Sequence, residues 1–277
     1  SLEKPYFCPM FLSLMKKTIL VVLAVITLAS CSEYQEALKS EDMGLKYAFA
    51  DSLYDIGKYR KSLKLWEQIV PAYRGKPQAE RVMYLYADAH FQVEDYYLAG
   101  YQFDRFVSAY PDSDKAEEAQ YKAAVSYAEL SPNYQLDQSE TEKGLDYLQQ
   151  FITAYPDSEY AADANERIKD LSVKLQKKSY EVAKGWHKIM EYPAAIASFD
   201  DFLSDYPGSP FREAAFFYKL DSQYQYGSKS INVLVKPRLE EAIEMYETLI
   251  RYFPEGEYRT EADAIKADID QILENYS

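Results

Sequence analysis

The sequence has few of the residues that enzymes and metal proteins use for chemistry. Its 277 residues include 2 cysteines and 2 histidines, and they contain no CxxC pair of a redox or zinc motif. His90 and His187 lie far apart within helical patterns, so we interpret both as helix-surface or packing residues rather than metal ligands. A glycine-rich phosphate loop and a nucleophile elbow are also missing. The sequence therefore predicts no disulfide framework, no metal site and no catalytic nucleophile.

Positive charge is scarce as well. The chain has 31 Lys and Arg against 45 Asp and Glu, a formal net charge of -14. Such a surface repels polynucleotides, which excludes nucleic acid as an expected partner. Adjacent acidic pairs such as Glu117–Glu118 point about 100° apart on a helix and cannot share a reacting atom. We therefore expect a protein that is not an enzyme and needs no cofactor beyond a covalent lipid, discussed below.

Apolar and aromatic residues are abundant. Hydrophobic residues make up 48% of the chain and aromatic residues 16%, which is too much for a disordered protein. Tyrosine dominates, with 28 residues against 13 phenylalanines. Because a tyrosine ring can pack while its hydroxyl stays hydrated, this composition suits surfaces that are half buried.

An export signal precedes the folded part. Lys16 and Lys17 are followed by an apolar run of eleven residues, 18–28. A helix of that length rises roughly 16 Å, too little to cross a ~30 Å hydrocarbon core, so the run predicts a secretory signal. We interpret residues 1–14 as an extension upstream of the start at Met15, so that residues 1–30 are removed in the mature protein.

The residues after the apolar run carry a more specific pattern. Leu28-Ala29-Ser30-Cys31 resembles the bacterial lipobox. The resemblance implies cleavage before Cys31 and covalent lipid on that cysteine; the alternative is a chance cysteine after an ordinary signal. Ser32 stands where Asp would favour inner-membrane retention. By analogy we expect the outer membrane, with a lipid-anchored chain on its periplasmic face and a lipidated linker at 31–42.

One phrase recurs along the remaining chain. It occurs as "FVSAYPDS" at 106–113, "FITAYPDS" at 151–158, "FLSDYPGS" at 202–209 and in weaker form as "LIRYFPEG" at 249–256. Proline cannot continue a helix, and the residues after it offer a turn and an N-cap oxygen. We expect Asp114 to cap the next helix with Glu117, and Ser209 to cap one whose first residue is Pro210. Each phrase thus predicts a helix–turn–helix joint.

Small and large residues recur at matching places before each joint. Examples are Ala99, Phe103 and Phe106 before Pro111, and Ala195, Phe199 and Phe202 before Pro207. This pattern resembles the tetratricopeptide (TPR) repeat, in which small residues let two helices approach. We predict an all-α, TPR-like helical-repeat solenoid of about five helix pairs with a C-terminal capping helix. The units span approximately 43–76, 77–113, 114–158, 159–209 and 210–256, with the cap at 257–277.

Three segments depart from the repeat. Residues 131–141 and 227–238 interrupt the third and fifth units and predict loops. Residues 159–189 predict either two helical segments or one bent helix. In the third unit Gly144 and Leu148 replace the expected alanine and aromatic residue.

The lipobox, short linker, five TPR-like units and recurring Tyr-Pro phrase together resemble the BamD family, the lipoprotein of the outer-membrane β-barrel assembly machinery. The resemblance covers Cys31 to the C-terminus. It implies that the first units receive nascent outer-membrane proteins ending in an aromatic residue. The last units would dock POTRA domains of the barrel-forming subunit and other assembly lipoproteins.

The resemblance also suggests interaction residues in this sequence. The candidate client groove consists of Tyr47, Asp51, Tyr54, Tyr84, Asp88 and Phe91. The candidate docking residues are Tyr218, Asp221, Tyr224 and Val233. The alternative for each groove residue is simple packing against the adjacent helix.

Two other functions stay open at this stage. A periplasmic TPR adaptor that coordinates peptidoglycan synthesis or hydrolysis, as in the CpoB family, shares the Tyr-Pro phrase. An envelope hydrolase would rest only on the abundance of Asp and Glu.

Overall fold

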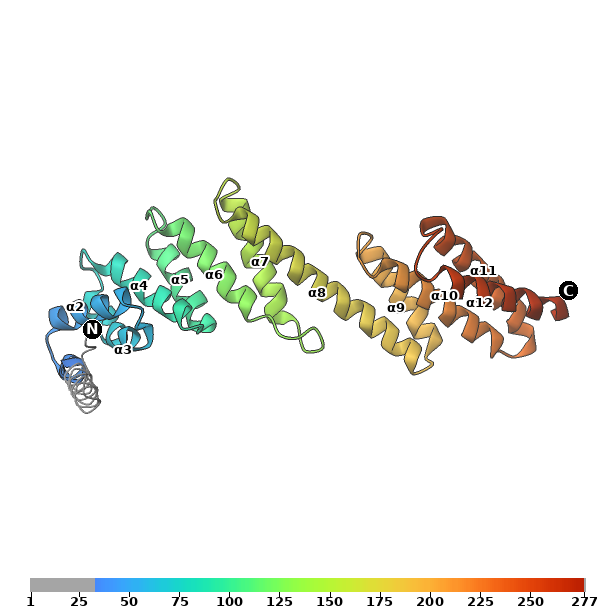
Figure 1. Cartoon of the computed structure of the whole chain (residues 1–277), viewed down its shortest axis with the longest axis horizontal. Helices are drawn as coiled ribbons and strands as arrows, with labels where there is room; N and C mark the ends of the chain where they lie inside the picture. Colours follow the sequence, from blue (N-terminus) through green and yellow to red (C-terminus); the bar gives the residue numbers. More distant parts are fainter. Residues whose placement is uncertain (1–32, 277) are drawn as a thin grey trace, which may run out of the picture. The chain divides into compact units, whose positions relative to one another are not determined.

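Figure 1 shows the computed structural model, in which residues 33–276 are described. Residues 1–14, the signal segment and Cys31 lie outside the described residues. Within 33–276 the chain consists of helices and turns without a strand, as the sequence predicts. None of the helices in this range combines the length and apolar character needed to span a bilayer.

The helices follow one another as antiparallel pairs joined by short turns (Figure 1). After a short helical stretch at 33–39, the elements are α2 (Met43–Asp55), α3 (Tyr59–Tyr73), α4 (Ala79–Gln92), α5 (Tyr96–Ala109), α6 (Ala116–Glu129), α7 (Ser139–Ala154), α8 (Ala161–Lys188), α9 (Tyr192–Asp205), α10 (Arg212–Ser228), α11 (Asn232–Tyr252), α12 (Arg259–Leu273) and the 3-10 turn Glu274–Tyr276. Each predicted unit contains one pair, and α12 follows the fifth.

The described residues form two compact units, 33–126 and 127–276, and the division falls inside α6. In the first unit α2 packs on α3, α3 on α4 and α4 on α5. Ala99, Phe103 and Phe106 of α5 are fully buried there, together with Trp66 of α3. Truncating a buried Phe to Ala costs about 3–5 kcal/mol, so these rings account for much of the stability of the unit.

The second unit repeats the same core. Ala195, Phe199 and Phe202 of α9 are fully buried, which confirms the register predicted from the sequence. A buried tyrosine on the preceding helix meets the second phenylalanine in both units. The ring centroids of Tyr84 and Phe106 lie 5.5 Å apart, and those of Tyr180 and Phe202 lie 6.0 Å apart.

Gly144 has a packing reason. A Cβ at this position would lie 2.8 Å from the Cα of Ala128 at the end of α6. Glycine therefore allows α7 to approach α6 more closely than alanine could. Leu148, one turn further on, is fully buried in the place of the expected aromatic ring.

The recurring phrase ends helices, as predicted. α5, α7, α9 and α11 all stop two residues before the proline. The tyrosine before the proline donates its N–H to the carbonyl of the phenylalanine four residues earlier and packs its ring against that phenylalanine. The ring centroids are 5.6 Å apart for Phe106–Tyr110 and 5.5 Å apart for Phe202–Tyr206. The four-residue spacing of Phe and Tyr in the phrase thus corresponds to about one helical turn, and the two rings pack together at the end of the helix.

The cap predicted after the proline is wrong in detail. α6 begins at Ala116 and α10 at Arg212, so neither Asp114 nor Pro210 occupies the expected cap position. The serine of the phrase forms a tight turn instead. Ser113 Oγ accepts the N–H of Lys115 at 3.0 Å, and Ser209 Oγ accepts that of Phe211 at 3.2 Å. A serine hydroxyl readily bonds its own backbone two residues on, which moves the helix start away from the proline.

The turns inside the pairs share a second geometry. The residue after the helix cap has positive φ in three of them: Gly57 at 73°, Glu94 at 64° and Met190 at 65°. The next N–H then bonds back to the carbonyl five residues earlier, as in Glu191 to Trp186 at 3.0 Å. This is a Schellman ending, which glycine adopts without strain and Glu94 and Met190 adopt at a cost.

The predicted interruptions differ from one another. Residues 130–138 form an ordered turn, where Gln138 Nε2 donates to the carbonyls of Asn133 at 3.0 Å and Leu136 at 2.9 Å. The loop predicted at 227–238 is wrong except at 229–231, because α10 continues to Ser228 and α11, which includes Pro237, begins at Asn232; residues 139–141 of the other predicted loop likewise belong to α7. Proline removes one helical hydrogen bond near the start of a long helix, and the helix tolerates it. The run 159–189 forms one helix, α8.

Candidate protein-interaction site

The six candidate groove residues lie on two neighbouring helices of the first unit. Tyr47, Asp51 and Tyr54 are spaced four and three residues apart on α2, so they share one face. Tyr84, Asp88 and Phe91 repeat this spacing on α4. The structure brings the two sets together, because side chains of α2 and α4 bond to one another directly.

Three polar contacts join α2 to α4. Arg81 Nη2 lies 2.6 Å from Asp51 Oδ1, and Arg81 Nε donates to Tyr47 Oη at 3.2 Å. One helical turn further, the Tyr54 hydroxyl donates to Asp88 Oδ2. The face of α2 that carries the candidate residues is thus tied along its length to α4.

Lys122 of α6 extends the network to a third helix. Its ammonium pairs with Asp88 Oδ1, contacts Tyr84 Oη at 3.2 Å and pairs with Glu118 Oε1 at 2.8 Å. Asp88 is almost fully buried, with 1% of its surface exposed, so its charge depends on Lys122 and Tyr54 for compensation. The network therefore joins α2, α4 and α6 through one buried carboxylate.

The network fixes the protonation of its members. Burial raises the pKa of Glu118, but hydrogen bonds from Lys115 and Lys122 outweigh burial and lower it to about 2. Burial lowers the pKa of Lys122, and the charge of Asp88 outweighs that, so the pKa is raised. At neutral pH the lysine and Glu118 are both charged, and they neutralise one another.

The two tyrosines of the network stay neutral. Burial, followed by the hydrogen bond to Asp88, raises the pKa of Tyr54. Burial, followed by the hydrogen bond to Glu118, raises the pKa of Tyr84. Both hydroxyls therefore act as hydrogen-bond partners throughout the physiological pH range and add no negative charge to the site.

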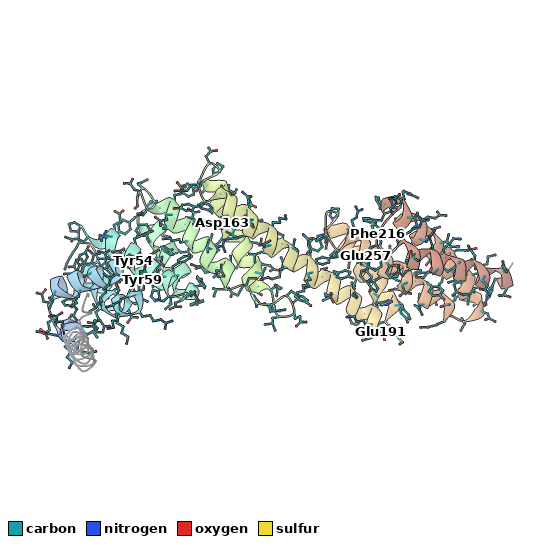
Figure 2. All side chains as sticks on the ribbon, viewed as in Figure 1. Tyr54, Tyr59, Asp163, Glu191, Phe216 and Glu257 are labelled. Atoms are coloured by element: carbon teal, nitrogen blue, oxygen red, sulfur yellow. The ribbon has the colours of Figure 1, made fainter. Side chains whose placement is uncertain are left out.

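Aromatic contacts complete the site. Tyr47 meets Trp66 edge-on at 5.5 Å and stacks on Tyr73 at 5.6 Å. Tyr54 lies beside Tyr59, with centroids 5.2 Å apart (Figure 2). The four tyrosine rings are half buried against their neighbours, whereas Trp66 is fully buried, so the tyrosines are held in place with part of each ring accessible to solvent.

The six candidates therefore differ in what a partner could reach. Tyr84 and Asp88 are buried and bonded within the unit. The residues with accessible surface are Tyr47, Asp51, Tyr54 and Phe91, each half buried. The sequence interpretation missed Arg81 and Lys122, the cations that hold the acids. The sequence carried a signal for both cations. Arg81 lies about one helical turn from Tyr84, and Lys122 lies about one turn from Glu118, so each shares a helix face with that residue.

The candidate docking residues lie on α10 and α11 of the second unit. Tyr218 stacks on Phe199 at 6.5 Å, with the Lys184 ammonium 4.4 Å from its ring. Asp221 Oδ2 lies 3.3 Å from His187 Nε2, where burial lowers the pKa of the histidine. These three α10 contacts resemble those of the first unit in joining neighbouring helices.

The remaining docking candidates differ sharply in exposure. The Tyr224 hydroxyl donates to Asp268 of α12, so this residue ties the end of the array together. Val233, the second residue of α11, is 76% exposed.

Both histidines are packing residues, as predicted: His90 is buried against Tyr86, and His187 accepts or donates a bond with Ser222 Oγ at 3.0 Å.

Three further apolar side chains are exposed in the turns before α9 and before α11, and the sequence interpretation missed them. Ile189 and Met190 in the α8–α9 turn and Ile231 before α11 are between 63% and 69% exposed. Lys229 Nζ donates to Tyr192 Oη at 2.9 Å, which places the α8–α9 turn beside the end of α10. We call Ile189, Met190, Ile231 and Val233 the apolar edge.

The fold and its surfaces define the class of protein. Antiparallel helix pairs that stack with a repeating core are typical of helical-repeat scaffolds that bind other proteins. The sequence matches the model of YfiO, "Outer membrane lipoprotein", over residues 40–232 and again over 172–277. The chain belongs to this family of outer membrane lipoproteins.

Two solved structures of other proteins are similar to the chain at low identity. The crystal structure of nearly identical TPR-like repeats from a Podosopora anserina putative kinesin light chain is 13% identical, covers 78% of this chain and 94% of its own, and has a TM-score of 0.32. The TPR2AB-domain:pHSP90-complex of yeast Sti1 is 13% identical, with 82% and 98% coverage and a TM-score of 0.36. No curated protein matches the sequence significantly.

Proposed function

We propose that this chain is a non-enzymatic scaffold and substrate receptor of the outer-membrane β-barrel assembly machinery, held by lipid on Cys31 at the periplasmic face of the outer membrane. The observation that carries the proposal is the family match, which covers residues 40–277 in two overlapping segments. The helix pairs support it, because such arrays bind extended peptides and folded domains along their surfaces.

The first unit would receive the nascent outer-membrane protein. Tyr47, Tyr54 and Phe91 present aromatic edges, and the network through Asp88 and Lys122 holds them in position. An extended segment ending in an aromatic residue could stack on such edges while its backbone bonds to the tyrosine hydroxyls. The internal neutralisation of Asp88 and Glu118 removes the charge that would repel an acidic segment.

The second unit would dock the POTRA domains of the barrel-forming subunit and the other assembly lipoproteins. The apolar edge supports this assignment, because exposed apolar side chains on neighbouring turns are typical of protein interfaces. Tyr218, Asp221 and Tyr224 would act mainly by holding α10 against its neighbours.

Affinity purification with a tag after residue 277 tests the function. We expect recovery of a POTRA-bearing barrel protein, and its loss from the Val233→Asp variant because a carboxylate would be desolvated in the interface. Leu136→Asp, at a residue 60% exposed in the 130–138 turn, is the matched control and should keep the barrel protein. Recovery of cell-wall synthases or peptidases in place of a barrel protein would contradict the proposal.

A photo-crosslinking residue tests the client site. Placed at Tyr47, it should capture newly exported outer-membrane proteins; placed at Tyr252, which is 53% exposed in the second unit, it should not. Equal capture at both positions would remove the groove from the proposal.

The lipid anchor has its own test. Cys31→Ala should release the protein from membranes, because it removes the proposed site of lipid attachment. The helical fold should stay intact. Sedimentation with membranes after a high-salt wash would show that something other than lipid anchors the chain.

A further inference from the structure

The strongest concentration of positive charge lies at the turn between α2 and α3. Lys58, Arg60, Lys61 and Lys64 fall within seven residues that contain no acid, in a chain of formal net charge -14. All four are exposed. We call these four residues the basic tip.

The basic tip is not neutralised by its surroundings. None of its four side chains forms an ion pair within residues 33–276, whereas Lys122 and Arg81 of the same unit are both paired with carboxylates. Asp55 and Glu67 flank the segment in sequence, and Glu94 lies across a shallow depression of about 570 Å³. Four cations thus face three acids here, and Glu33 and Glu36 lie on the neighbouring stretch 33–39.

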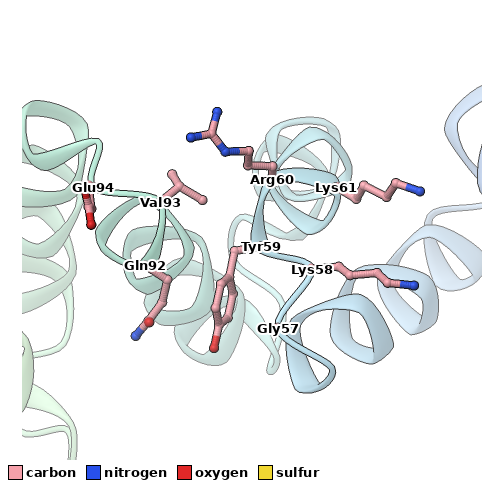
Figure 3. A pocket seen from close by; sticks show the side chains of 8 residues that line it. All are labelled: Gly57, Lys58, Tyr59, Arg60, Lys61, Gln92, Val93 and Glu94. Atoms are coloured by element: carbon pink, nitrogen blue, oxygen red, sulfur yellow. The ribbon is translucent and has the colours of Figure 1, made fainter.

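An exposed apolar residue, Ile56, lies just before the basic tip in the sequence. Ile56, directly before the turn residue Gly57, is 60% exposed. Figure 3 shows Lys58 and Lys61 extending to the same side of the turn, with Arg60 extending on the side of Val93. An exposed aliphatic residue next in sequence to a cluster of exposed cations suits a surface that is anionic outside and apolar beneath.

The start of the described chain is attached to this same turn. Tyr34 is buried, with 7% of its surface exposed, and its hydroxyl donates to the carbonyl of Lys61 at 3.3 Å. The Lys61 ammonium lies 5.0 Å from the centre of the Tyr34 ring. Tyr34 is thus held rigidly against the basic tip.

Chain length then limits how far the tip can lie from the anchor. Tyr34 follows Cys31 by three residue steps, and an extended chain spans at most about 3.6 Å per step, or roughly 11 Å in all. A lipid on Cys31 would therefore keep the tip within about one or two Debye lengths of the headgroups, where cations are attracted to anionic lipid.

We propose that the basic tip binds anionic phospholipid headgroups of the membrane that carries the Cys31 lipid, with Ile56 entering the headgroup layer. This inference rests on the proposed lipidation of Cys31. It gives the tip the role of a second membrane contact, which orients the first unit on the bilayer. Lipid chains alone would leave a tethered body free to rotate.

A fluorescent probe next to the tip tests the proposal on the mature lipidated protein. Its Cys31 would be capped by lipid, so Ile56→Cys supplies a thiol for an environment-sensitive dye. The protein is reconstituted into vesicles of phosphatidylcholine with or without phosphatidylglycerol, with a headgroup-level nitroxide lipid as quencher. We expect quenching in the anionic vesicles that decreases at least about threefold at high salt, because ions screen headgroup attraction.

Charge variants with a matched control decide whether the tip is responsible. Replacing Lys58, Arg60 and Lys64 by Gln should reduce quenching as high salt does; Lys61 is left unchanged because it packs on Tyr34. The control replaces Lys169, Lys188 and Lys236 by Gln, which removes the same charge from exposed sites of the second unit and should not change quenching.

Each outcome assigns the failure to one idea. Vesicle flotation and the mass of the N-terminal peptide report lipidation independently; absence of lipid overturns both the anchor and this inference. A protein that floats but whose probe at residue 56 is unquenched overturns the inference alone. A tip variant that stays quenched while losing a protein partner would assign the tip to a protein interface and also overturn it.

Discussion

The two compact units share a repeating core, but they differ in the side chains that are bonded within the unit and those that are exposed to solvent. In the first, acids on α4 and α6 meet cations from α4 and α6 and hydroxyls from α2, so the polar groups between helices are bonded within the unit. In the second, Ile231 and Val233 stand in water at 69% and 76% exposure. The polar groups between the helices of the first unit are therefore satisfied internally, whereas the second unit has an apolar edge that a partner would cover.

The comparison also separates stability from recognition. The candidates at the centre of the first unit, Asp88 and Tyr84, are buried and belong to its structure. Changes there should unfold the unit, whereas changes at Val233 should affect binding with little effect on the fold. Stability measurements on the two units can test this distinction.

The largest effect is expected at Asp88. Asp88→Ala should destabilise the first unit by about 3–5 kcal/mol, because it leaves the Lys122 ammonium and the Tyr54 hydroxyl without their shared buried partner. Chemical denaturation followed by circular dichroism measures this. The control is Asp200→Ala, which breaks the exposed pair with Lys219 in the second unit and should cost less than about 1 kcal/mol. Equal effects would mean that the network is no more than a surface feature.

Overpacking tests whether the two cores are equivalent. Ala99→Trp and Ala195→Trp should each destabilise their own unit by at least roughly 1–3 kcal/mol, because both alanines are fully buried at helix contacts. Thermal melts would show the loss. An unchanged melting temperature for one of them would show that the repeat register differs between the units.

Acid should weaken the first unit through Glu118. Its pKa is lowered from 4.5 to about 2 in the folded state, so its contribution is fully present above pH 4.5 and is lost as the pH falls toward 2. Glu118→Gln should flatten this part of the stability profile, measured by denaturation between pH 2 and 6. Glu240→Gln, on an exposed residue of the second unit, should leave the profile unchanged.

The smallest effect is expected at the strained turns. Met190→Gly should stabilise the second unit by about 1 kcal/mol, because glycine adopts the positive φ of 65° without a Cβ clash. Gly57→Ala, at a positive φ of 73°, should do the reverse in the first unit. If Met190→Gly destabilised the protein, the methionine side chain would have to make a contact that its 68% exposure does not suggest.

Much of the fold could be predicted because its signals are local. The phrase with Phe106, Tyr110 and Pro111 closes one helical turn and stops the helix through contacts within a few residues. The predicted cap positions were wrong because two local signals of this kind compete at neighbouring residues. A serine at Ser113 and an aspartate one residue later are both good caps, and the choice depends on which N–H the turn presents.

What this sequence determined by itself is the repeat: where helices stop, and which small and large residues alternate in the core. What only the tertiary structure decided is which polar groups meet. Tyr54 finds Asp88, and Asp88 finds Lys122, each 34 residues further along the chain. Backbone turns depend on neighbours in sequence, but a charge is neutralised or left exposed by whichever helix packs against it, and that is settled only when the helices stack.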